Sequence, residues 1–289
     1  MSRSNVHIEN EDCRVGMKRL ADNSVSLILT DPPYFMDGMG DDWDAAKLKR
    51  RVKKGVVGSL PAGMKFSAQQ GLDLQRFLTP VACEWMRVIR PGGFCLVFSQ
   101  NRLAHRTAVA LEEARFEIRD VLLWRYEGQA KAFSQEHWVR KRKLPDAEKR
   151  RLIRKLGGRK TAQLKPQGEM IILGQAPVEG TLVDNWDRWE TGLIDVSSPL
   201  INPDQFPGSV IPVSKPKKRH GHLTPKPVAL LQHLIRIFSA PGSLVLDAFA
   251  GSGSTGVAAK REGRAFIGYE IEAETAASAQ ARIESAVYA

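Results

Sequence analysis

The sequence lacks the features that mark secreted, metal-binding or membrane proteins. Only three cysteines occur among the 289 residues, Cys13, Cys83 and Cys95, and their spacing matches neither a disulfide framework nor a zinc site. The stretch 1–10 is polar and lacks the apolar core of a signal peptide, and no apolar run approaches the roughly 20 residues of a membrane span. We therefore expect a cytoplasmic protein with no metal and no membrane partner.

The sequence also has too few acidic residues to balance its lysines and arginines. Its formal net charge is +11, and residues 128–165 alone hold 13 Lys or Arg against three acidic residues. Concentrated positive charge attracts a polyanion, because neutralised phosphates release their condensed counterions. A solvated helix face is the alternative explanation. The confinement of nearly all the net charge to one segment favours a nucleic-acid partner.

Apolar patterns predict strands and helices in alternation. The buried-type strand 25–30 must end at Asp31-Pro32-Pro33, since proline has no amide hydrogen and a fixed φ. The stretch 35–71 shows no period and is predicted as a long loop, whereas 176–216 is irregular and rich in turn residues. Alternation at this pitch predicts a doubly wound, mostly parallel sheet. Its elements are helices at 72–89, 103–114, 228–238 and 254–262 and strands at 94–98, 116–124, 167–173, 243–246 and 265–269.

A glycine-rich turn follows the strand 243–246 and opens a helix. Gly251, Gly253 and Gly256 spell G-x-G-x-x-G, and Glu270 comes about twenty residues later at the end of the next strand. Such a turn lets backbone approach a nucleoside ligand, while the acidic residue can bind ribose hydroxyls. A dinucleotide-dependent dehydrogenase and a turn without a ligand are both alternatives for this motif taken alone.

The position of the turn in the chain argues against the dehydrogenase. Only 19 residues follow Glu270, so the rest of the sheet must come from the N-terminal part. This order predicts a circularly permuted Rossmann-like fold in which the nucleoside-binding strands come last. Because ligands of such sheets bind at the carboxyl ends of the strands, Asp31 and the Gly251 turn are expected to face one pocket.

These motifs resemble those of the beta-type amino-group, adenine-specific DNA methyltransferases. Asp31-Pro32-Pro33-Tyr34 is similar to the catalytic motif of that family, and 247–256 is similar to its cofactor motif, in the same permuted order. Further similarity lies at 10–13, 84–93, 222–227 and 266–270, so that residues 128–216 are left largely unmatched. The chain departs from the family at Leu223, where a proline is usual, and in a longer loop after Tyr34.

The resemblance implies a division of the chain into three regions. Residues 1–126 are expected to form the catalytic half of a methyltransferase domain, 127–216 an inserted basic target-recognition region, and 217–289 the cofactor-binding half. It also implies transfer of a methyl group from S-adenosylmethionine to a base in double-stranded DNA, as in restriction–modification. A homodimer and a partner restriction nuclease are further partners that the resemblance leaves open.

The resemblance also implies the roles of individual residues. Asp31, Pro32, Pro33 and Tyr34 are the predicted catalytic residues. An exocyclic amine is a poor nucleophile, and the Asp31 carboxylate and Pro32 carbonyl can each accept one of its hydrogens and free its lone pair for in-line attack. The base must be flipped out of the helix, and Tyr34 would stack on it. The predicted cofactor residues are Asp12, Cys13, Thr224, Lys226, Asp247, Phe249, Gly251, Ser252, Gly253 and Glu270.

Base and target specificity follow less directly. The family uses Asp at the first catalytic position mainly with adenine and Ser mainly with cytosine, so adenine-N6 is predicted and cytosine-N4 is the alternative. An RNA or small-molecule methyltransferase would share the glycine turn without needing the basic insert, and an inactive binding module would not need Asp31 with Tyr34. Arg140, Arg142, Arg150 and Arg154 are the candidate DNA contacts. Trp138, Trp186 and Trp189 are expected in the core.

Overall fold

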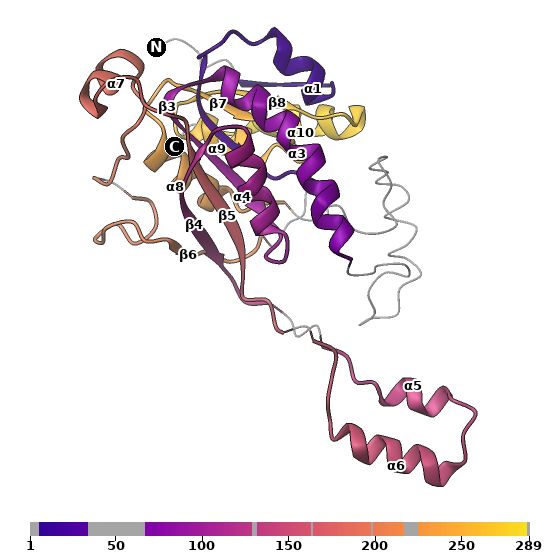
Figure 1. Ribbon diagram of the computed structural model, residues 1–289. Helices are drawn as coiled ribbons and strands as arrows, with labels where there is room; N and C mark the ends of the chain where they lie inside the picture. Colours follow the sequence, from indigo (N-terminus) through magenta and orange to yellow (C-terminus); the bar gives the residue numbers. More distant parts are fainter. Residues whose placement is uncertain are drawn as a thin grey trace. The chain divides into compact units, whose positions relative to one another are not determined.

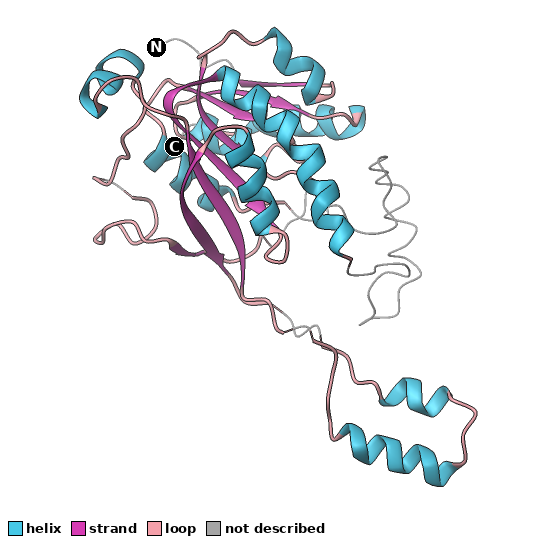
Figure 2. Cartoon of the chain, in the orientation of Figure 1, coloured by secondary structure: helices cyan, strands magenta, loops and turns pink. Residues whose placement is uncertain are grey.

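A computed structural model of the chain describes residues 6–33, 67–128, 132–162, 164–197, 199–216 and 225–287. Within them, an eight-stranded sheet carries helices on both faces (Figures 1 and 2). All neighbouring strands are parallel except for β5, which runs antiparallel to both β3 and β4. The order across the sheet is β1 (Val6–Glu9), β8 (Ala265–Tyr269), β7 (Leu244–Asp247), β2 (Val25–Thr30), β3 (Ile89–Ser99), β5 (Gly168–Gln175), β4 (Glu117–Arg125) and β6 (Val210–Pro212).

This topology confirms the predicted permuted sheet. The last two strands of the chain, β7 and β8, lie between the first two, and Leu27 and Ile28 of β2 pair with Val245 and Leu246 of β7. The two predicted motifs, more than 200 residues apart in sequence, therefore leave adjacent parallel strands in the same direction.

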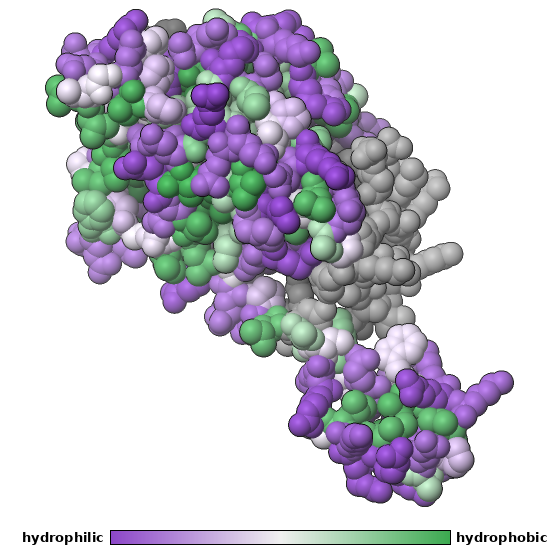
Figure 3. Space-filling model, in the orientation of Figure 1, coloured by the Kyte–Doolittle hydropathy of each residue, from purple (hydrophilic) through white to green (hydrophobic). Residues whose placement is uncertain are grey.

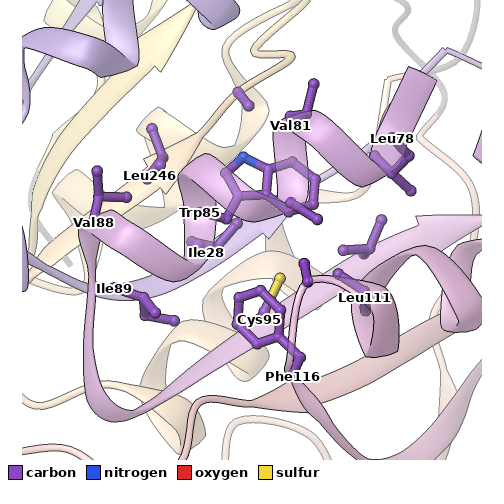
Figure 4. Close-up of a cluster of buried hydrophobic side chains, with 14 of the residues drawn as sticks. Ile28, Leu78, Val81, Trp85, Val88, Ile89, Cys95, Leu111, Phe116 and Leu246 are labelled. Carbon is purple, nitrogen blue, oxygen red and sulfur yellow. The ribbon is translucent and has the colours of Figure 1, made fainter. Parts of the chain in front are cut away.

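The central strands β2, β7 and β8 read as continuous apolar runs because both faces of the sheet are buried there. The strand β4 is largely exposed. In β2, Ile28 packs into one layer while Leu27 and Leu29 pack into the other. Figure 4 shows Trp85 of α3 (Ala68–Val88) in the first layer, among side chains from the helices and the sheet. The helix α4 (Ala104–Glu113) covers the same face. The second layer holds α8 (Val228–Phe238), α9 (Ser254–Arg261) and α10 (Ala273–Ser285). No helix in the described residues is long and apolar enough to cross a lipid bilayer.

The chain divides into two compact units. The larger one includes 67–126 and 168–289, and the described part of the smaller one lies within 127–167. The smaller unit pairs α5 (Glu136–Lys141) with α6 (Asp146–Leu156). The segments that flank the two helices are joined by two hydrogen bonds of 3.0 Å, in which the Phe133 amide donates to Thr161 Oγ1 and the Thr161 amide donates to Phe133 O. Figure 3 shows apolar side chains gathered on its visible face and edged by polar ones. The predicted recognition region 127–216 thus extends past the compact unit, because β5, α7 (Leu182–Trp189) and β6 belong to the larger one.

The predicted irregular stretch 176–216 contains a helix, α7 (Leu182–Trp189), and the strand β6. A capping box between Thr181 and Asp184 begins α7. Asn185 anchors it: this fully buried amide donates to Pro91 O at 3.0 Å and Thr191 O at 2.9 Å and accepts from Glu179 N at 2.8 Å. Only one of the eight residues of α7 is buried, and a single buried residue is too weak a pattern to identify the helix from the sequence.

Replacement of Asn185 by Ala should destabilise the protein. It leaves the Glu179 amide without its acceptor, and a buried polar group without a partner costs about 1–3 kcal/mol. Urea unfolding should show a lower free energy for Asn185→Ala and no comparable change for Asp187→Ala, which removes an exposed side chain from the same helix. Equal stability of the two variants would contradict the anchoring role.

Candidate active site

The predicted functional side chains meet at one edge of the sheet. Parallel strands end at the same edge, so Asp31 after β2, Asp247 at the end of β7 and Glu270 after β8 come together there. The antiparallel strand β5 begins at that edge, because its Met170 pairs with Ser99 at the end of β3. Charged residues from the ends of the parallel strands and from the start of β5 are therefore concentrated at this edge.

A buried hydrogen bond connects the catalytic motif with the cofactor motif. Thr30 Oγ1 donates to Asp247 Oδ1 at 2.6 Å, and the amide of Phe249 donates to the same oxygen at 3.1 Å. Asp247 is 4% exposed, and burial raises the pKa of its carboxyl group to about 6. The bond holds the residue before Asp31 against the start of the glycine turn.

The glycine turn has the geometry that a nucleoside site requires. Gly251 and Gly253 adopt φ of 49° and 72°, a region that other residues rarely occupy. A Cβ on Gly253 would stand 3.0 Å from Ala279 Cβ, a tight contact, so glycine at this position also lets the turn pack closely against α10. Ser252 is fixed by Arg282, whose Nη1 donates to its carbonyl at 2.8 Å. These positions fit the close approach of a ligand to the backbone.

Glu270 closes this turn from the neighbouring strand. Its Oε2 accepts from the amide of Gly251 at 3.0 Å and its Oε1 from the amide of Glu272 at 2.9 Å. Burial raises the pKa of the Glu270 carboxyl group. A half-buried carboxylate next to a glycine turn can accept hydrogen bonds from ribose hydroxyls. Glu270 and the glycine turn together therefore fit the nucleoside part of S-adenosylmethionine.

The acidic segment near the N-terminus reaches the same edge. Asn10 Nδ2 donates to Glu270 O at 2.9 Å, and Asp12 caps α1 (Cys13–Gly16), which a short 3-10 turn (Met17–Arg19) follows. Arg14 binds Asp12 at 2.6 Å and lowers the pKa of that carboxyl group. Cys13 is buried, and burial raises the pKa of its thiol to about 12, so it packs as an apolar residue.

Phe249 is joined to this segment through one further aromatic ring. It packs on Phe77 with 5.9 Å between ring centroids, and the Arg14 guanidinium lies 5.8 Å from the Phe77 centroid. The structure thus brings the predicted cofactor residues of the two chain ends to one neighbourhood.

Lys226, which the resemblance predicts as a cofactor residue, contacts Asp31 of the predicted catalytic motif. Its ammonium forms an ion pair with Asp31 Oδ2 and a second one with Glu169 Oε1 at 3.0 Å, and it lies 4.9 Å from the centroid of the Phe98 ring. The Lys226 side chain is only 8% exposed. Burial alone would lower the pKa of Lys226, but the charges of Asp31 and Glu169 outweigh it, and the net shift is upward.

Two more residues of the predicted catalytic motif lie beside Asp31: Pro32 is buried and Pro33 is half-buried. Tyr34 and Thr224 lie outside the described residues.

The predicted core tryptophans and DNA contacts belong to the segments around α5, α6 and α7. Trp138 and Trp186 are 61% and 39% exposed, so their predicted place in the core is wrong; their helices bury other faces. The candidate DNA contacts are all exposed on α5 and α6 or just after α5, namely Arg140, Arg142, Arg150 and Arg154.

Sequence reasoning did not single out Glu169. The apolar pattern at 167–173 predicts the strand that carries it, but not the direction of that strand. Only the antiparallel pairing of β5 with β3 places the first residues of β5 beside Asp31.

The permuted sheet, the glycine turn and the motif after β2 define a Rossmann-like methyltransferase. Comparison with known proteins gives the family: a model described as DNA methylase, N6/N4 type, matches residues 25–281. The chain belongs to the N6/N4 DNA methylase family and is a DNA methyltransferase. S-adenosylmethionine, the cofactor predicted from the sequence, is the methyl donor of this family.

Individual relatives resemble the chain over most of its length. It is 29% identical to the type II methyltransferase M.HindIII of Haemophilus influenzae over 286 residues, which cover 91% of this chain and 90% of the relative. Two solved structures share the fold. PvuII DNA methyltransferase, which is cytosine-N4-specific, superimposes with a TM-score of 0.62 at 18% identity over 96% of this chain and 85% of its own. The M1.HpyAVI–SAM complex gives 0.53 at 19% identity over 96% and 98%.

The raised pKa of Asp247 leads to a stability prediction. Between the ordinary pKa of 3.8 and about 6, the folded protein binds the Asp247 proton more tightly than the unfolded chain does. Its contribution to stability is therefore lost as pH rises through that window. Asp247→Asn keeps an oxygen for Thr30 and Phe249 but cannot titrate. Its free energy of unfolding relative to wild type should rise by about 2–3 kcal/mol from pH 4 to about pH 7 and then stay level. Urea unfolding at several pH values measures this, and parallel curves would contradict it.

Proposed function

We propose that the protein methylates the N6 amine of an adenine flipped out of duplex DNA, with Asp31 as the group that accepts an amine hydrogen. The observation that carries the proposal is the Thr30–Asp247 bond, which joins the residue before Asp31 to the glycine turn. A base held at Asp31 and a nucleoside cofactor held at Gly251 would then be neighbours.

The residues of the chain act by positioning. Asp247, Phe249, Gly251, Ser252, Gly253 and Glu270 would hold the cofactor, which supplies an electrophilic sulfonium methyl group when bound. The Asp31 carboxylate and the Pro32 carbonyl each accept one amine hydrogen, which draws the nitrogen lone pair out of conjugation with the ring. Hydrogen bonds to a charged acceptor contribute about 1.5–3 kcal/mol each. The amine proton is lost after the new bond forms, so no separate base is required before attack.

The choice of adenine depends on Asp31. A cytosine-N4-specific enzyme shares the fold, so the fold does not discriminate between the two bases. Aspartate at the first position of the catalytic motif favours adenine, as the resemblance to the adenine-specific group implies. Cytosine-N4 remains the alternative. A cytoplasmic location is part of the proposal, whereas the resemblance leaves a homodimer and a partner restriction nuclease open.

We further assign DNA contact to the α5–α6 unit. Arg150 and Arg154 project from α6, whose eleven residues bury no side chain. Residues one turn apart lie on the same side of a helix, so both can face one run of phosphates. Such contacts supply affinity and register, whereas base edges supply the sequence information.

Asp31→Ala should abolish methyl transfer while cofactor binding persists. The variant lacks the acceptor for the amine but leaves Thr30, Asp247 and Glu270 in place. Labelled methyl transfer to unmethylated DNA, followed by nucleoside analysis, should show N6-methyladenine with wild type and with Asp204→Ala, an exposed control, and no label with Asp31→Ala. Near-normal turnover in Asp31→Ala would refute the role of Asp31. Label in methylcytosine would refute the choice of adenine, and label in RNA alone would refute the choice of DNA.

The double variant Arg150→Ala/Arg154→Ala should bind DNA more weakly and with less dependence on salt. Removing one arginine that neutralises a phosphate lowers the slope of log K against log salt by about 0.9, so the slope should fall by about two. Fluorescence anisotropy with a labelled duplex measures both quantities. Arg119→Ala, which removes an exposed arginine from the larger unit, is the matched control. A slope equal to that of the control would remove α6 from the interface.

A further inference from the structure

Glu169 lies in the catalytic neighbourhood although it belongs to no recognised motif. It is the second residue of β5 and pairs in register with Trp124 of β4. Its side chain is 17% exposed, and Oε1 stands 3.0 Å from Lys226 Nζ. Because β5 runs antiparallel to β3, a residue at its start is delivered to the edge where β2 ends. The pairing of the strands therefore places Glu169 at the same edge of the sheet as Asp31.

The Lys226 ammonium is held between two carboxylates that come from different strands. Asp31 follows β2, Glu169 is the second residue of β5, and the lysine itself precedes α8. A buried ammonium is costly unless it is paired, and two carboxylates at one site would repel each other without it. The three groups thus form a single charged cluster in which the position of Lys226 depends on both acids.

We propose that Glu169 is a positioning residue for methyl transfer, which holds the Lys226 ammonium against Asp31 and so fixes the direction of the carboxylate that receives the target amine. The proposal rests on the role proposed above for Asp31. Lys226 engages Oδ2, and each carboxylate oxygen has two lone pairs, so the ion pair and an amine hydrogen bond are compatible. Glu169 itself touches neither base nor cofactor in this scheme.

The cluster must keep Lys226 protonated in order to work. Among the described residues, the groups that face Lys226 include Asp31, Glu169, the Phe98 ring and, close to both charges, Tyr126 after β4. The two carboxylates raise the pKa of Lys226 against the effect of burial. Removing the charge of Glu169 leaves the burial in place and takes away part of the compensation. The pKa of Lys226 should then fall, and the alkaline limb of the activity profile should move to lower pH.

Kinetic measurements on the full chain with duplex DNA test the proposal. Glu169→Gln is expected to lower kcat by about 10- to 100-fold, the scale of a small misplacement of a reacting group, and to leave the cofactor Kd within about twofold. The alkaline limb of kcat should move to lower pH. Tyr126→Phe should leave that limb in place, which excludes the Tyr126 phenol as its cause. Glu179→Gln removes an exposed charge that pairs with Arg188 and should behave as wild type.

A double-mutant cycle separates positioning through Lys226 from a general structural role. Lys226→Met removes the ammonium, so adding Glu169→Gln to it should cause no further loss of kcat. Glu169→Asp keeps the charge and should recover part of the activity if Glu169→Gln proves unstable in thermal melting. Multiplicative losses in the double variant, an unmoved alkaline limb, or a loss confined to the cofactor Kd would each overturn the proposal. Activity in Asp31→Ala would instead overturn the proposed role of Asp31, whatever Glu169 does.

Discussion

The hydrogen bond from Thr30 Oγ1 to Asp247 Oδ1 is the interaction on which the rest of the site depends. It joins the ends of two adjacent parallel strands that are separated by 217 residues of chain. Both groups are buried, and a polar pair in an apolar interior tolerates little displacement, since each partner would otherwise lose its hydrogen bond. This bond therefore fixes the position of the backbone before Asp31 relative to the start of the glycine turn.

The same edge concentrates charge that the fold must compensate locally. Glu270 is satisfied by two backbone amides, and Asp31 and Glu169 share the Lys226 ammonium. Each of the three acids thus accepts from a donor that lies outside its own strand. A site assembled in this way resists local change, because moving one strand removes a partner from another.

Sequence patterns predicted the larger unit well because its central strands are buried on both faces. The runs at 25–30 and 265–269 match β2 and β8, and the amphipathic period at 228–238 matches α8. The short helix α7 was missed, since its one buried residue, Asn185, is polar and its neighbours are exposed. The same contrast holds in the candidate site. The proline motif after β2 and the glycine turn have recognisable local patterns, whereas Glu169 has none.

Three features could be recognised from the amino-acid sequence: the strand that stops at Asp31, the glycine turn after β7 and the concentration of basic charge in residues 128–165. These features depend on local chemistry: the missing amide of proline, the positive φ open to glycine, and the summed charge of neighbours. The antiparallel direction of β5 and the ion pairs of Lys226 with Asp31 and Glu169 are visible only in the folded protein. Strand direction and long-range ion pairs depend on how distant segments pack, and no local pattern records that packing.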